Sequence, residues 1–245
     1  MCDVADASRR DLTERALTRP RGVPRGEEKT VFFSHSVVSL RRAHTSCLSK
    51  ERERDLSKER EIWNCETHAC SRFEALAQTE EFGLLPRQVL HGDANDENVL
   101  VEEEDDHDAW RVTLLDFGDF VRGPRVFELA IALAYALFDA KDHARGSDES
   151  SGDGGAREAL RKACVVAAAY HATNPLSPNE LEALWPCVAA RNCQTVLHSA
   201  HASSLEPDDA YLTTSAAPAW RLLAQVDALP ANDAALALKK ACHLA

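Results

Sequence analysis

The chain has 245 residues, of which 28 are Lys or Arg and 40 are Asp or Glu, so its formal net charge is −12. This length suits one domain or two small ones, and a hydrophobic content of 44% is enough to bury a core. The acidic balance argues against nucleic acid and against an anionic membrane surface as partners, because both require a cluster of Lys and Arg. We therefore expect neither kind of partner.

Two further features bear on the location of the protein. No stretch reaches the roughly 20 apolar residues that span a bilayer, and the N-terminus lacks the apolar core of a secretory signal. The eight cysteines follow no disulfide framework spacing, which predicts reduced thiols. Together these features predict a cytoplasmic protein.

The part of the chain before Pro86 gives no motif. Residues 1–30 are charged and interrupted by Pro and Gly, so we expect a disordered lead. Residues 31–48 are rich in apolar side chains and could form a strand or a helix. Residues 51–63 combine both charges with good helix formers, which predicts a solvated helix with ion pairs between positions i and i+4.

Short segments rich in β-branched residues follow Pro86 and predict strands at 88–91, 98–102 and 110–117. The acidic segment between the last two cannot be buried. We therefore expect these two strands to form a hairpin with an exposed connection.

The pattern becomes helical beyond Gly123. Pro124 suits the first turn of a helix whose apolar residues recur on one face up to Leu137. Gly, Ser and acidic residues predict a flexible linker near 143–156. Further helices are predicted to start near Ala156, Asn179, Pro218 and Asp233.

The chemically informative segment is HGDANDEN, residues 91–98, which is followed 18 residues after Asn98 by DFGD, starting at Asp116. If the strands on either side form the predicted hairpin, Asn98 at the start of one strand lies beside Asp116 at the end of the other. Asp93 then converges on the same point.

Three such side chains suit phosphoryl transfer. Mg²⁺ prefers oxygen ligands and takes few protein carboxylates beside nucleotide phosphates, so Asn98 and Asp116 could bind both the metal and, through it, the nucleotide. Asp93 could accept the proton of an attacking hydroxyl. We predict that Asp93 is the catalytic residue.

The pair HGDxxxxN and DFGD resembles the aminoglycoside phosphotransferase-like (protein-kinase-like) superfamily. Within it, HGDANDENVLVE and LLDFGDFVRGPRVFELAIALAYALF are most similar to the hydroxylysine kinase family. The resemblance spans roughly residues 35–230. By this resemblance Asp93 matches the catalytic aspartate, Asn98 and Asp116 match the metal ligands, and His91 matches a position that organises the loop.

The resemblance implies a mostly helical α+β fold, the C-terminal lobe of a kinase-like protein, over residues 31–245. It implies a small-molecule kinase with Mg²⁺ as cofactor and GTP or ATP as phosphate donor. The implied acceptor is the hydroxyl of an amine-bearing small molecule, 5-hydroxy-L-lysine. No strand before His91 carries an Ala-x-Lys pattern, so we expect the N-terminal nucleotide lobe of such kinases to be missing.

Other polar groups have competing interpretations. Asp96, Asp119 and Glu128 could contact the substrate, although a structural hydrogen bond is the favoured role for Glu128. An acidic helix start could bind an amine or act only as a cap; it comprises Glu206, Asp208 and Asp209.

Two groups of potential metal ligands are better explained without a metal. Cys65, His68 and Cys70 do not have the spacing of a standard zinc module, so reduced thiols and a helix-face histidine are favoured. His198 and His201 share a predicted helix face and are expected to be packing or surface residues.

Two alternatives to a kinase remain open. One is a truncated, catalytically inactive kinase-like lobe that acts as a binding fragment. The other is a metal-dependent phosphohydrolase that uses the same acids on water, which Asn98 and the DFGD strand fit less well.

Overall fold

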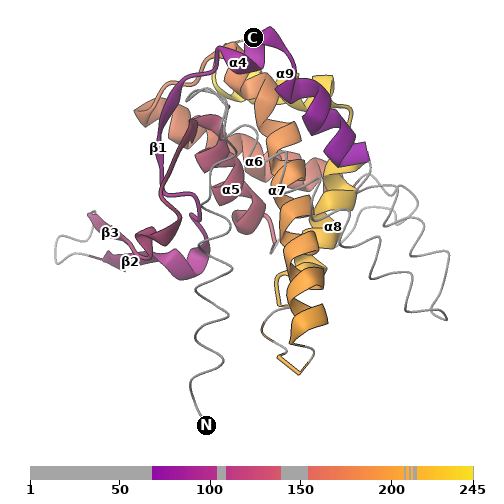
Figure 1. Ribbon diagram of the computed structural model, residues 1–245. Helices are drawn as coiled ribbons and strands as arrows, with labels where there is room; N and C mark the ends of the chain where they lie inside the picture. The colour runs from indigo at the N-terminus through magenta and orange to yellow at the C-terminus, as the bar shows by residue number, and fades with distance from the viewer. Residues whose placement is uncertain are drawn as a thin grey trace, which may run out of the picture.

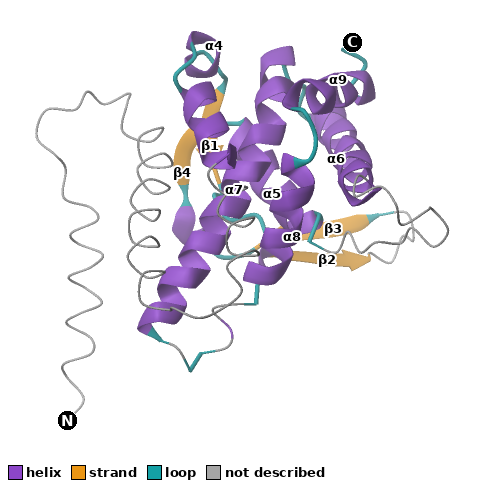
Figure 2. Ribbon diagram, turned by 90° about the vertical axis from the view of Figure 1, so that its right-hand side faces the viewer, coloured by secondary structure: helices purple, strands orange, loops and turns teal. Residues whose placement is uncertain are grey.

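The computed structural model describes residues 68–103, 109–138, 154–206, 208, 209, 211 and 214–244. Within these residues the chain is mostly helical, with two separate two-stranded antiparallel sheets. The helices form the body of the molecule, and one of the sheets projects from it (Figures 1 and 2). This arrangement agrees with the predicted α+β class.

The predictions for the N-terminal part of the chain fall outside the described residues. They comprise the lead at 1–30, the strand or helix at 31–48, the charged helix at 51–63 and the expected absence of a nucleotide lobe. Most of the expected linker near 143–156 also lies outside them, and its last three residues are helical.

The described helices begin with residues 68–77 and the short α4 (Glu80–Gly83). The later ones start within two residues of their predicted positions. They are α5 (Val126–Ala136), α6 (Gly154–Thr173), α7 (Pro178–Leu205), α8 (Ala216–Asp227) and α9 (Ala231–Ala241).

Helix α7 lies at the centre of the helical body, where it packs against α5, α8 and α9 (Figure 1). Most of its apolar residues are buried, with Leu205 at its end exposed, and Leu133 of α5 is fully buried. The indole Nε1 of Trp185 donates to the backbone oxygen of Val226 at 3.3 Å and so joins α7 to α8. None of the described helices is both long and apolar enough to cross a bilayer.

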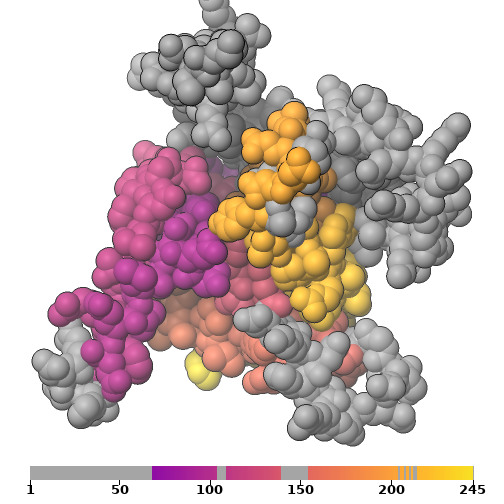
Figure 3. All heavy atoms as spheres, turned by 90° about the horizontal axis from the view of Figure 1, so that it is seen from below, coloured from indigo at the N-terminus to yellow at the C-terminus, as the bar shows by residue number. Residues whose placement is uncertain are grey.

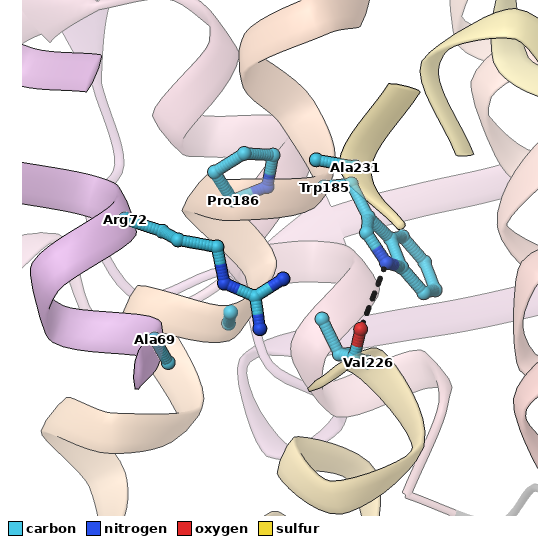
Figure 4. Close-up of a pocket in the computed structure, with 7 residues that line it drawn as sticks. Ala69, Arg72, Trp185, Pro186, Val226 and Ala231 are labelled. Atoms are coloured by element: carbon cyan, nitrogen blue, oxygen red, sulfur yellow. Dashed lines mark hydrogen bonds between the residues drawn. The ribbon is translucent and has the colours of Figure 1, made fainter. Parts of the chain in front are cut away.

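A small gap between these helices is lined in part by Arg72, Trp185 and Pro186 (Figure 4). It measures about 10 Å³, which is room for a single water molecule at most. It is therefore a packing defect and too small for a substrate.

The start of α7 is fixed by a capping box and a buried ion pair. Ser177 and Glu180 cap each other: the Ser177 backbone N donates to Glu180 Oε2 at 2.8 Å, and the Glu180 backbone N donates to Ser177 Oγ at 3.3 Å. Arg125, just before α5, donates through Nε and Nη2 to the two carboxylate oxygens of Glu180, at 2.9 and 2.7 Å. The network therefore ties the start of α5 to the start of α7.

Strand β1 (Arg87–Leu90) pairs with β4 (Val121–Pro124). The sequence did not predict β4, and the placement of Pro124 in a first helical turn was wrong. Pro124 instead ends β4 opposite Arg87, and α5 starts two residues later. A two-stranded sheet accommodates this proline because each strand has one edge without a hydrogen-bonding partner.

The projecting sheet is the predicted hairpin. It pairs β2 (Val99–Glu103) with β3 (Trp110–Leu114) in antiparallel register, and Val101 faces Val112. The residues that join them, 104–108, lie outside the described part of the chain.

Candidate functional site

The predicted HGDANDEN segment forms a compact loop between β1 and β2. After Leu90 the loop runs to the 3-10 helix η1 (Asp96–Asn98), which leads directly into β2. The Asn95 side chain caps η1, since its Oδ1 accepts a hydrogen bond from the Asn98 backbone N at 2.9 Å. Asx side chains are well suited to such local turns.

Asp93 is held inside this loop by two amide side chains. Its Oδ2 accepts hydrogen bonds from Asn95 Nδ2 at 3.0 Å and from Asn98 Nδ2 at 3.2 Å. Asn98 Nδ2 also donates to the Asp93 backbone oxygen at 3.0 Å. Asp93 and Asn98 are therefore in direct contact, as the sequence predicted.

The hairpin brings Asp116 to the same place. Val99 pairs with Leu114, and the Leu115 backbone N donates to the Asn98 backbone oxygen at 2.9 Å. Asp116 follows in a left-handed conformation, with φ 52° and ψ 76°, and its Oδ1 accepts a hydrogen bond from the Gly118 backbone N at 3.2 Å. The turn it opens contains the 3-10 helix η2 (Phe117–Asp119).

Gly92 lies close to this turn. Its φ is +86°, and a Cβ at this position would lie 2.5 Å from the Asp119 backbone oxygen. Only glycine combines this backbone conformation with such a contact. The approach fixes the distance between the segments that carry Asp93 and Asp116.

His91 has the loop-organising position that the resemblance implied. Its ring is buried, with Nε2 2.7 Å from the Leu115 backbone oxygen and Nδ1 3.4 Å from the Asp93 backbone N. A backbone N–H can only donate, so Nδ1 is the acceptor and Nε2 carries the proton. The ring also packs against Phe117 and Phe120, with centroid distances of 5.1 and 6.2 Å.

Glu128, in the first turn of α5, contacts the backbone of the same loop. Its Oε2 accepts hydrogen bonds from the backbone N of His91 at 2.6 Å and of Gly92 at 3.4 Å. These contacts fit the structural alternative that the sequence favoured for Glu128. The other two candidate substrate contacts, Asp96 and Asp119, are exposed.

Arg191 of α7 was not predicted to belong to the site. Its Nη2 donates to Asp93 Oδ1 at 2.9 Å and to the Tyr135 hydroxyl of α5, also at 2.9 Å. A sequence signal existed, because Arg191 is the one Lys or Arg in α7 and follows the apolar Cys187 and Val188 at helical spacing. A charge on such a face needs a partner, but sequence spacing does not identify one that lies 98 residues away.

No described α-helix begins at the predicted acidic helix start, although Asp209 Oδ1 accepts a hydrogen bond from the Tyr211 backbone N at 3.0 Å, as a cap would. Glu206, Asp208 and Asp209 follow the C-terminal end of α7, which continues to Leu205, and α8 starts only at Ala216. They line an open depression beside the end of α7. Their exposure limits the cost of placing carboxylates near the negative end of the helix dipole.

The donor set at the site suits Mg²⁺. The Asn98 side chain uses its amide nitrogen for both contacts with Asp93, and its oxygen takes part in neither. That oxygen and the exposed Asp116 carboxylate are hard ligands of the kind that Mg²⁺ takes together with nucleotide phosphates. Across the described ranges, no group of three or more His, Cys, Asp or Glu side chains could hold a metal.

The cysteines of the described part behave as reduced thiols. Cys70, Cys187, Cys193 and Cys242 are buried and form no disulfide. Burial strongly raises the pKa of the Cys187 thiol, which keeps it protonated and unreactive. Of the unusual Cys and His cluster, Cys65 lies outside the described residues and His68 is exposed.

The loop, the turn and the hairpin lie on one side of the helical body. In the space-filling view from below, the purple and magenta residues that include them project from the molecule (Figure 3). The hairpin residues with side chains on one face are largely apolar and exposed. These exposed apolar residues are Val101, Trp110, Val112 and Leu114.

Comparison with known proteins agrees with this geometry. The family model of the phosphotransferase enzyme family matches residues 18–163, which include the loop, the hairpin and the Asp116 turn. No solved structure matches significantly.

Curated relatives with similar sequences are hydroxylysine kinases. The protein from Bos taurus is 32% identical over 143 residues, which cover 56% of this chain and 34% of that protein. The protein from Xenopus laevis is 30% identical over 143 residues, covering 55% of this chain and 33% of that protein. The chain therefore spans about a third of the length of the curated relatives it matches.

Proposed function

Because this chain belongs to the phosphotransferase enzyme family, we propose that it acts as a small-molecule kinase. The reaction is transfer of the γ-phosphate of GTP or ATP to the hydroxyl of an amine-bearing acceptor, 5-hydroxy-L-lysine. The observation that supports the proposal is the contact of Asp93 with Asn98, together with the hydrogen bond from Leu115, the residue before Asp116, to Asn98.

In this proposal Asp93 is the catalytic residue. The acceptor hydroxyl oxygen forms a bond to the γ-phosphorus while the bond to the bridging oxygen of the nucleoside diphosphate breaks. Asp93 takes the hydroxyl proton and holds the oxygen in line for attack. The amides of Asn95 and Asn98 donate to Asp93 Oδ2 and hold the carboxylate within the loop.

Asn98 and Asp116 would bind Mg²⁺ through the amide oxygen and the carboxylate. When bound, Mg²⁺ would neutralise negative charge on the transferred phosphoryl group. The rigid hairpin contact at Leu115 keeps the two ligands together. Asp96, Asp119 and Glu128 are proposed as acidic groups near the acceptor amine. Of the three, Glu128 already accepts a hydrogen bond from the loop backbone, and we propose that it keeps this contact and does not bind the amine directly.

We also propose that residues 31–245 form the C-terminal lobe of a kinase-like fold. The mostly helical body with a small hairpin at one side supports this assignment. The net charge of −12 favours an acceptor that carries an ammonium group.

The test is phosphoryl transfer by the 245-residue chain. Purified protein with Mg²⁺, γ-labelled GTP or ATP and 5-hydroxylysine should form labelled product, and unmodified lysine, which lacks the hydroxyl, should not. Asp93→Asn should lower the rate by about 10² to 10⁴-fold, the range that a general base contributes. Asp233→Asn, an exposed carboxylate at the start of α9, is the matched control and should leave the rate unchanged.

Removal of Mg²⁺ by a chelator should abolish the transfer. The proposal is wrong if no hydroxylated amine becomes labelled, or if Asp93→Asn retains the wild-type rate. Phosphate release that is faster than transfer would favour the phosphohydrolase alternative instead.

A non-catalytic binding lobe is the second candidate, favoured by the exposed apolar face of the hairpin. Trp110 is 62% exposed and Val112 is 60% exposed. Apolar patches of this kind often mark interaction sites. Binding of Mg²⁺ and nucleotide together with transfer would exclude this candidate.

A further inference from the structure

Asp93 is held from two directions. Its Oδ2 is bound by the amides of Asn95 and Asn98, which belong to its own loop. Its Oδ1 is bound by Arg191, which comes from the middle of α7 in the helical body. The loop alone therefore leaves one carboxylate oxygen unfixed, and a distant helix fixes it.

The guanidinium of Arg191 is itself immobilised. Its Nη2 donates to the Tyr135 hydroxyl at 2.9 Å, and its Cζ lies 5.4 Å from the centroid of the Tyr135 ring. Its Nη1 donates to Gln194 Oε1 at 3.2 Å. The Arg191 side chain is only 15% exposed, and α5 and α7 pack against each other. Arg191 therefore presents a fixed donor to a residue in a loop.

The chemistry of arginine suits orientation of a base. A guanidinium stays protonated at any physiological pH, so it cannot compete with Asp93 for the hydroxyl proton. Its planar donors fix the direction of a carboxylate more strictly than an ammonium does. Both terminal nitrogens of Arg191 already donate to protein side chains, and its Nε is buried. This geometry argues against a role in substrate binding.

We infer that Arg191, braced by Tyr135, is a positioning residue that holds Asp93 Oδ1 in the orientation needed to accept the acceptor's proton. This inference rests on the proposed kinase function, and it gives the helical body a role in the reaction. It couples the packing of α5 against α7 to the reaction at the loop.

The kinetic test compares Arg191→Gln with Arg161→Gln. Arg161 also donates to a carboxylate, that of Glu158, but on the exposed surface of α6. Arg191→Gln should lower kcat by about tenfold to a hundredfold, the cost of a small misplacement of a reacting group, and leave the KM of the acceptor nearly unchanged. Arg161→Gln should match the wild type in both constants.

Two further variants distinguish a changed orientation of Asp93 from a general loss of folded protein. Arg191→Lys should lie between the wild type and Arg191→Gln, because an ammonium still donates to Asp93. Tyr135→Phe should lower kcat less than Arg191→Gln, again without changing KM. Rates are taken per folded molecule, from the unfolding midpoint of each variant. The inference is overturned if Arg191→Gln keeps the wild-type kcat, if it raises KM alone, or if Arg191→Lys is no more active than Arg191→Gln.

A spectroscopic measurement tests the contact without requiring turnover. Side-chain ¹H–¹⁵N NMR signals of the Arg191 guanidinium should shift in Asp93→Asn and remain in place in Asp233→Asn. Unchanged signals in Asp93→Asn would overturn the inference. If the wild type transfers no phosphate to any acceptor, the proposed function fails, and the NMR result then reports separately whether Arg191 orients Asp93.

Discussion

Gly92 and Asp116 both have positive φ angles, 86° and 52°, and they lie on the two segments that meet at the candidate site. Asp116 adopts its conformation with the help of its own side chain, which accepts a hydrogen bond from the Gly118 backbone N. Gly92 has no such help, and its conformation depends on the absence of a side chain. The site therefore tolerates no added Cβ at Gly92.

Gly92→Ala should destabilise the protein by about 2 to 4 kcal/mol. The cost combines a left-handed conformation with a steric contact, since the new Cβ would lie 2.5 Å from the Asp119 backbone oxygen. Gly83→Ala is the matched control, because nothing lies within 4 Å of a Cβ there and alanine is the better helix former. Urea unfolding followed by circular dichroism measures both variants. Equal stabilities for the two would contradict this account of Gly92.

Whether a residue of the site could be predicted from the sequence depends on how far along the chain it lies from the other residues of the site. Asp93 and Asn98 lie in one continuous segment, and the hairpin that adds Asp116 is predictable from short β-branched segments around an acidic turn. Arg191 and Tyr135 belong to helices whose relative packing no local pattern encodes. Their contribution became visible only in the folded chain.

Among the elements, α5 and α7 are joined at their starts by a polar network around Glu180 and Arg125. Burial alone would raise the pKa of Glu180, but the hydrogen bonds from Arg125 and Ser177 outweigh it and lower that pKa. Arg125 is also bound by Asn174 and by the Pro175 backbone oxygen, at 2.6 and 2.7 Å. A buried ion pair with every partner in place is stable, but it is costly to break from one side.

Glu180→Gln should therefore cost about 3 to 5 kcal/mol at pH 7. A carboxyl with a lowered pKa in the folded state contributes stability that is fully present above its unfolded value, near 4.5, and is lost as the pH falls through the folded value. The difference between wild type and Glu180→Gln should shrink as the pH falls below about 4.5.

Denaturant unfolding at a series of pH values between 7 and about 3.5 measures this difference. Glu158→Gln, which breaks the exposed pair with Arg161, should cost less than about 1 kcal/mol at pH 7. A Glu180→Gln effect that is the same at every pH would show that the carboxyl charge is not what stabilises the junction.

The starts of the helices from α5 to α9 were predictable to within two residues, and the start of α7 is marked by Ser177 of the capping box. Strand β4 was missed because its four residues, VRGP, contain Gly and Pro, which normally interrupt strands. The strand exists because Gly123 and Val121 pair with residues of β1, although the loop, the hairpin and the turn separate the two strands in the sequence. This pairing of distant segments therefore overrides the low strand propensity of the four residues.

At the scale of the molecule, burial is unevenly distributed. The body around α7 buries nearly all of its large apolar side chains, whereas the hairpin of β2 and β3 is exposed on both faces. The segments that hold Asn98 and Asp116 start from the base of this hairpin, where Leu115 contacts Asn98. The buried packing of the body and the segments that carry Asp93, Asn98 and Asp116 therefore lie in different parts of the molecule, and Arg191 of α7 joins the two through Asp93.

This separation predicts how substitutions in the two parts differ. Leu133→Ala removes a fully buried side chain of α5 and should cost about 2 to 5 kcal/mol, because the densely packed body can close the resulting cavity only in part. Val112→Ala removes a side chain that is 60% exposed on the hairpin and should cost less than about 1 kcal/mol. Leu236→Ala, on the exposed face of α9, controls for the replacement of a leucine by alanine. It should also lower the free energy of unfolding only slightly. Urea unfolding of the three variants gives the comparison, and a Val112→Ala cost equal to that of Leu133→Ala would mean that the hairpin is part of the folding core.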